Sequence, residues 1–124
     1  MTPTDAARFM NELFAIWTET NHTARRAAIE THFDPDVDLH DPDGEFIGYD
    51  ALEAFSNSLQ QRFPGARFEM VGRPDRVGNA LRTNWRFGPD RGTDFVLLHD
   101  QKVRSLYAFV QPASPDRSTW PTFA

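Results

Sequence analysis

In the second half of the chain, inward-type and polar side chains alternate along the sequence, whereas the first half shows helical spacing. This alternation limits the fold more than any other feature. In the stretch LRTNWRF, residues 81–87, apolar residues and one threonine alternate with arginine or asparagine residues. Such alternation is typical of an antiparallel strand that has one buried and one solvent-facing side. Residues 66–74 form a candidate strand before it, and residues 92–110 read as two strands joined around Asp100–Gln101. The pattern predicts a four-stranded meander.

The first half shows helical spacing instead. Apolar residues recur every three to four positions up to Trp17, and Thr4 is positioned to cap that helix. A second helix is predicted through residues 24–33, with Thr23 as its cap and the Asp34–Pro35 pair as its end. A third lies within residues 48–65. Two helices therefore precede a β-hairpin, a third helix and four strands.

This element order gives the fold class. Helices gathered early and strands gathered late are typical of an α+β fold, with helices packed on one face of a curved, mainly antiparallel sheet. The 124 residues suffice for one domain with its own core. We expect this domain to span residues 1–111 and to be followed by a proline-rich C-terminal tail, residues 112–124.

Composition excludes several classes of function. The chain has no cysteine, so disulfides and thiolate metal sites are ruled out. Its net charge is −5, its pI is near 5.2 and its only lysine is Lys102, which argues against nucleic-acid binding. Residues 1–14 lack the pattern of a signal peptide, and no apolar run is long enough to span a membrane. The sequence therefore predicts a cytoplasmic protein that binds no membrane.

The stretch DVDLHDPDGEFIG, residues 36–48, concentrates aspartates where a strand begins. If residues 36–41 form that strand, Val37, Leu39 and Asp41 share its inner side and His40 points outward. Asp41 can then accept hydrogen bonds from N–H groups of the following turn, which needs no function. Alternatively it faces a cavity, where burial would raise its pKa and make it a proton acceptor. The spacing does not fit an EF-hand calcium loop.

Asp94 is a second candidate, because it also begins an apolar strand face, together with Val96. It can lie half in water at the strand start. If it faces a cavity instead, an apolar environment could keep it protonated as a hydrogen-bond donor. Two carboxyls whose environments drive their pKa values apart are a known way to separate a base from an acid.

Several motifs together resemble a known family. They are His40-Asp41-Pro42 with Gly44, Gly48 before the third helix, Phe63-Pro64-Gly65 at its end, and Gly92-Thr93-Asp94-Phe95. The chain in this respect resembles the nuclear transport factor 2-like superfamily, most closely its SnoaL-like polyketide cyclase and ketosteroid isomerase-like branches. The resemblance implies a cystatin-like α+β roll, in which a cone-shaped sheet wraps around three helices and leaves a pocket at its open end. It also implies a homodimer.

The resemblance assigns roles to both carboxyls. In ketosteroid isomerases an aspartate in the matching Asp-Pro-x-Gly stretch shuttles the proton, which corresponds to Asp41. A protonated aspartate on a later strand contributes to the oxyanion hole, which corresponds to Asp94. The tyrosine that those enzymes carry on the first helix falls near Leu13 or Phe14, and neither can donate a hydrogen bond. This departure argues against steroid isomerisation.

The pocket walls are expected to be aromatic and apolar, although the same spacing would also suit plain core residues. His40 is a candidate polar helper, despite its outward direction by alternation. No metal and no cofactor is expected. The candidate wall residues are Phe14, Trp17, Phe55, Leu59, Trp85, Phe87, Val96 and Tyr107.

Two functions remain open from the sequence. The first is an enzyme that binds a small apolar or aromatic molecule and transfers a proton next to a carbonyl, as an isomerase or aldol-type cyclase. Hydrolase and dehydratase variants would use the same pocket, because one fold supports many chemistries. The alternative is a non-catalytic ligand-binding or homodimeric interaction module.

Overall fold

The computed structural model describes residues 1–112. Within them, three helices and six strands follow the predicted order, and the α+β class is confirmed. Apart from Pro112, the predicted tail lies outside the described residues. The elements are α1 (Pro3–Ile16), α2 (His22–His32), β1 (Phe33–Asp41), β2 (Gly44–Ile47), α3 (Tyr49–Arg62), β3 (Phe68–Val77), β4 (Ala80–Phe87), β5 (Asp90–His99) and β6 (Lys102–Gln111).

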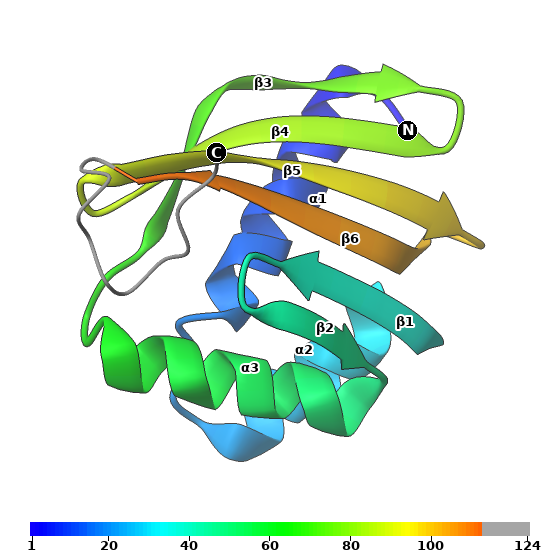
Figure 1. Cartoon of the computed structure of the whole chain (residues 1–124). Coiled ribbons are helices and arrows are strands. Elements are labelled where there is room, and N and C mark those ends of the chain that lie inside the picture. Colours follow the sequence, from blue (N-terminus) through cyan, green and yellow to red (C-terminus); the bar gives the residue numbers. More distant parts are fainter. Residues whose placement is uncertain (113–124) are drawn as a thin grey trace.

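The strands form one mixed sheet in the order β2-β1-β6-β5-β4-β3. All neighbouring strands are antiparallel except β1 and β6, which pair in parallel. The sheet is curved and does not close, since β2 and β3 remain as edges. Figure 1 shows α1 crossing behind the long strands β4 to β6, while α3 runs beside the β1–β2 hairpin. This is the open, cone-shaped sheet that the family resemblance implies.

The helix starts differ from those expected. α1 begins at a capping box in which Thr2 and Asp5 exchange side-chain-to-backbone hydrogen bonds, with Pro3 in the first helical turn. Asn21, whose side chain accepts from Ala24 N–H, caps α2. The predictions of Thr4 and Thr23 as caps were therefore wrong. In both cases a capping residue two positions earlier satisfies the free N–H groups and lengthens the helix.

The core lies between α1, α3 and the inner face of the sheet. In β4 the predicted alternation is observed, with Leu81, Thr83, Trp85 and Phe87 buried. In β1, Val37 and Leu39 are buried on the same side, as expected. The inner face of the sheet is therefore continuous from β1 to β4 and covered by the helices.

A β-bulge in β6 changes the side to which its residues point. Leu97 pairs with Ser105 but Leu98 pairs with Val103, so Arg104 is an extra residue in β6. Beyond the bulge, Leu106 is buried and Tyr107 lies on the outer face with 39% of its surface exposed. The placement of Tyr107 in the pocket was wrong, because simple alternation from Val103 does not account for the added residue.

Candidate functional site

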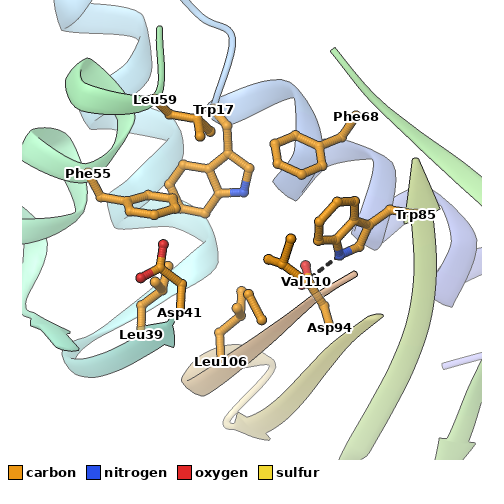
Figure 2. A pocket seen from close by; sticks show the side chains of 11 residues that line it. Trp17, Leu39, Asp41, Phe55, Leu59, Phe68, Trp85, Asp94, Leu106 and Val110 are labelled. Atoms are coloured by element: carbon orange, nitrogen blue, oxygen red, sulfur yellow. Dashed lines mark hydrogen bonds between the residues drawn. The ribbon is translucent and has the colours of Figure 1, made fainter. Parts of the chain in front are cut away.

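One cavity lies between the inner face of the sheet and the helices, and Figure 2 shows its walls. About 20 Å³ is open to the centres of water-sized spheres, which is room for about one ordered water molecule. Any larger ligand would have to displace side chains of the wall. The lining residues are Trp17, Leu39, Asp41, Phe55, Leu59, Phe68, Trp85, Asp94, Leu106, Ala108 and Val110.

Asp41 enters the cavity from the end of β1. One carboxylate oxygen, Oδ1, accepts hydrogen bonds from the backbone N–H groups of Asp43 (2.8 Å) and Gly44 (3.1 Å). The turn geometry and the cavity position, which the sequence left as alternatives, thus occur together. Burial raises the pKa of the Asp41 carboxyl above its ordinary value, while the two N–H groups partly oppose this shift.

Asp94 enters the same cavity from the middle of β5 and is only 5% exposed. Its Oδ1 accepts a hydrogen bond of 2.9 Å from Trp85 Nε1. Among the described residues, no positively charged group contributes to the pKa shift of Asp94, so burial is the dominant cause. Burial raises the pKa of Asp94 to about 7, and the hydrogen bond from Trp85 only partly lowers it. Near neutral pH a large share of Asp94 is therefore protonated.

The two carboxyls thus differ in environment while sharing one cavity. Asp41 is half-buried and held by backbone N–H groups, which favour its anion. Asp94 is enclosed by apolar walls such as Leu106 and Val110, which favour its neutral form. Figure 2 shows them on two sides of the cavity, with Leu106 between them. The arrangement can therefore offer a proton acceptor and a hydrogen-bond donor to one small molecule.

The cavity walls coincide only in part with the sequence-based candidates. Trp17, Phe55, Leu59 and Trp85 line it. The other inward candidates, Phe14, Phe87 and Val96, are buried beside it in the core and do not line it.

Five wall residues were missed. Phe68 lies within the candidate strand 66–74 and was identifiable by its aromatic ring, and Leu39 was already expected to face inward. The remaining three follow the bulge in β6, so only the structure shows which side they face. The missed residues are Leu39, Phe68, Leu106, Ala108 and Val110.

His40 does not contribute to the cavity. It lies on the outer face, where Nε2 is 2.7 Å from an Asp38 carboxylate oxygen and its ring stacks on Tyr107 with centroids 4.5 Å apart. Ser105 Oγ donates to the other oxygen of Asp38 at 2.7 Å. The prediction that His40 is a polar helper of the pocket was therefore wrong. Side chains alternate along β1, and this alternation places His40 on the outer face.

Two further features of residues 1–112 concern binding. No group of three or more histidine, aspartate or glutamate side chains converges in a way that could hold a metal ion. No helix in this part of the chain has both the length and the apolar character needed to cross a membrane.

A SnoaL-like domain model matches residues 6–111, which include every residue lining the cavity. No curated protein matches the chain. Among solved structures, a SnoaL-like family protein from Agrobacterium tumefaciens, provisionally called an isomerase, shares 27% identity and a TM-score of 0.81. That alignment covers 88% of this chain and 99% of the Agrobacterium chain.

Two more distant structures share the fold. A provisional polyketide cyclase from Sinorhizobium meliloti is 16% identical with a TM-score of 0.68, covering 87% of this chain and 99% of its own. A protein from Catenulispora acidiphila with a ketosteroid isomerase-like fold was solved in complex with trimethylamine. It is 14% identical with a TM-score of 0.73, covering 91% of this chain and 93% of its own.

Proposed function

The chain belongs to the SnoaL-like domain family, and on that basis we propose that it binds a small apolar or aromatic carbonyl compound and catalyses cofactor-free proton transfer beside the carbonyl. Asp41 is the base in this proposal and Asp94 is the hydrogen-bond donor. The names given to the solved relatives, isomerase and polyketide cyclase, are compatible with such chemistry.

One observation carries the proposal: two carboxyls in different environments line the same apolar cavity. A carboxylate can accept a proton only if it is ionised, and a carboxyl can donate a hydrogen bond only if it is protonated. The backbone N–H groups on Asp41 and the apolar surroundings of Asp94 favour these different states. Neither state requires another reactant.

The proposed reaction is balanced within the substrate and Asp41. The C–H bond beside the carbonyl breaks, its proton passes to Asp41, and its electron pair moves to give an enolate with charge on oxygen. Asp94 donates a hydrogen bond to that oxygen, which lowers the energy of the enolate. Return of the proton from Asp41 to another carbon gives an isomer. Attack of the enolate on a second carbonyl of the same molecule forms a ring, and the resulting alkoxide takes up the proton from Asp41.

The proposal can be tested before the natural substrate is identified. The compound 2-indanone is planar, largely apolar and has acidic protons beside its carbonyl. Incubation in D2O with the protein should accelerate exchange of these protons for deuterium, as followed by NMR, and Asp41→Asn should abolish the acceleration. If 2-indanone and a panel of similarly sized planar ketones all exchange at the buffer rate, the catalytic proposal is wrong.

A specific observation favours the alternative of a homodimeric module, with or without catalysis. The outer face of β5 and β6 exposes large apolar side chains, namely Phe95, Leu97, Tyr107 and Phe109. Phe95 and Phe109 contact each other edge to face at 5.6 Å. Exposed apolar residues that cluster on one face are typical of interfaces. A second copy of this chain is the partner we propose, as the family resemblance implies.

A further inference from the structure

Trp17 presents an unused hydrogen-bond donor to the cavity. It directly follows α1, lines the cavity and is only 3% exposed. Within the part of the chain that the structure describes, its Nε1–H makes no hydrogen bond, whereas the indole of Trp85 donates to Asp94. Trp17 Nε1 is not among the fully buried polar atoms that lack a partner in the described residues, so this N–H is accessible and an acceptor in the cavity can reach it.

The indole of Trp17 is also held firmly in place. Its ring packs against Phe33 at 5.7 Å and edge to face against Phe55 at 5.2 Å. Its backbone carbonyl accepts hydrogen bonds from Gln60 Nε2 at 2.9 Å and from Ser56 Oγ at 3.3 Å. These contacts connect Trp17 to α3 at both its backbone and its ring. A donor fixed in this way loses little conformational entropy when it binds a ligand.

The nitrogen of that ring is directed into the cavity. Figure 2 shows it on the edge of the indole that faces the space bounded by Phe68, Trp85 and Val110. Asp94 enters this same space from the sheet. An acceptor atom placed there would meet Trp17 from the helical side and Asp94 from the sheet side. The residues around it are otherwise apolar, so an acceptor would find few competing donors.

We propose that the carbonyl oxygen of the ligand accepts hydrogen bonds from both Trp17 Nε1–H and the Asp94 carboxyl, which makes Trp17 a second donor for the enolate oxygen. This inference rests on the proposed function and deepens it, because it adds a second donor and fixes where the carbonyl oxygen binds. Leu13 and Phe14 on α1 cannot serve this purpose, since both are buried in the core and neither can donate. Trp17 supplies the donor that these positions lack.

The geometry also predicts which ligands are preferred. A carbonyl oxygen has two lone pairs and can accept both hydrogen bonds, so ketones suit the site and hydrocarbons of the same shape, which have no acceptor, do not. 2-Indanone and indane form a matched pair that differs mainly in the carbonyl oxygen. The difference between their affinities isolates the contribution of the donors, because both molecules require the same displacement of the wall side chains.

The experiment compares wild-type protein with Trp17→Phe, which keeps an aromatic ring but removes the N–H group. We expect wild type to prefer 2-indanone over indane and Trp17→Phe to lose about tenfold of that preference, as for one hydrogen bond. Deuterium exchange of 2-indanone should slow by roughly a hundredfold, as for loss of one oxyanion donor. A merely structural role would weaken both ligands alike. Leu106→Ala, which shortens another wall side chain without removing a donor, should do this.

A second measurement needs no altered binding site. In ¹⁵N-labelled wild-type protein, the Trp17 indole proton should move downfield when 2-indanone is added and should not do so when indane is added. Trp17→Phe serves only to assign the resonance.

The outcomes separate this inference from the proposed function. If 2-indanone binds but the Trp17 resonance does not move, and Trp17→Phe retains the preference for 2-indanone, the inference is wrong. Catalysis by Asp41 is then decided separately, by the deuterium-exchange test. If the resonance moves but no exchange occurs, the donor assignment holds and the catalytic proposal fails. If neither 2-indanone nor any ketone of the panel binds wild type, both are overturned.

Discussion

Trp85 and Asp94 are joined by a buried hydrogen bond of 2.9 Å, from the indole Nε1–H to a carboxylate oxygen. The two residues lie on neighbouring strands, where Trp85 pairs with Gly92, two positions before Asp94. The ring of Trp85 therefore extends over Gly92 to reach the carboxyl. This bond fixes the direction of Asp94, while the surrounding apolar side chains determine its ionisation.

Gly92 is predicted to be essential for this arrangement. A Cβ atom at position 92 would lie 2.1 Å from Cζ2 of Trp85 and 2.4 Å from the carbonyl oxygen of Phe109, so Gly92→Ala must displace the indole or the strand. We expect a loss of about 1–3 kcal/mol in the free energy of unfolding, as for overpacked cores. Denaturant titration followed by tryptophan fluorescence measures it. Arg91→Ala, at an exposed neighbouring position, should cost less than about 0.5 kcal/mol. Equal stability of the two variants would contradict this account.

Asp94 is predicted to make stability depend on pH in an unusual direction. Its folded-state pKa is raised to about 7, so the native state binds a proton that the unfolded state has lost. Its contribution is complete below the ordinary aspartate pKa near 3.9 and disappears as pH rises through about 7. Wild type should therefore lose stability relative to Asp94→Asn across this window, by on the order of 4 kcal/mol. Urea unfolding of both proteins from pH 4 to 8 tests it. Parallel curves would mean that Asp94 titrates normally.

Asp41→Asn is predicted to reduce deuterium exchange of 2-indanone by about 10² to 10⁴-fold, since the amide cannot accept the proton. Asp43→Asn is the matched control, because Asp43 lies two residues away and is paired with Arg62 at 2.7 Å rather than directed into the cavity. That variant should stay within about threefold of wild type, a range expected for a surface change. A comparable loss in both variants would point to damage of the turn rather than to loss of a base.

Phe109→Glu is predicted to dissociate the proposed homodimer. Phe109 is 56% exposed on the outer face of β6, beside Phe95. A carboxylate there would have to be buried without a partner, which is costly at an interface. Sedimentation velocity should show a dimer for wild type and a monomer for the variant. Val77→Glu is the control, because Val77 is 80% exposed at the edge strand β3 and away from this surface. A monomeric wild type would refute the homodimer.

Much of the fold was predictable because local patterns agreed with the global arrangement. Alternation in β4 matched burial at each position, and the turn at Asp100–Gln101 occurs where the sequence predicted it. Both of these residues adopt positive φ, which suits a tight hairpin. The helix order and the switch to strands followed from hydrophobic spacing alone, since each element buries one face.

The β6 wall of the cavity was not predictable in the same way. Leu106, Ala108 and Val110 face inward only because Arg104 adds a residue to β6, and a bulge is a tertiary feature without a clear sequence signal. Tyr107 was misplaced for the same reason. The donor on Trp17 was also missed, because spacing identifies which side of a helix is buried but not which edge of an indole faces a cavity.

The central claim is that Asp41 and Asp94 share one apolar cavity as a base and a hydrogen-bond donor. ¹³C NMR titration of their side-chain carboxyl carbons tests it most directly, with Asp41→Asn and Asp94→Asn to assign the signals. We predict that the pKa of Asp94 lies near 7 and that the pKa of Asp41 is raised by a smaller amount above its ordinary value. If both carboxyls titrate at or below about 3.9, they are solvated anions and the proposed division of roles is wrong.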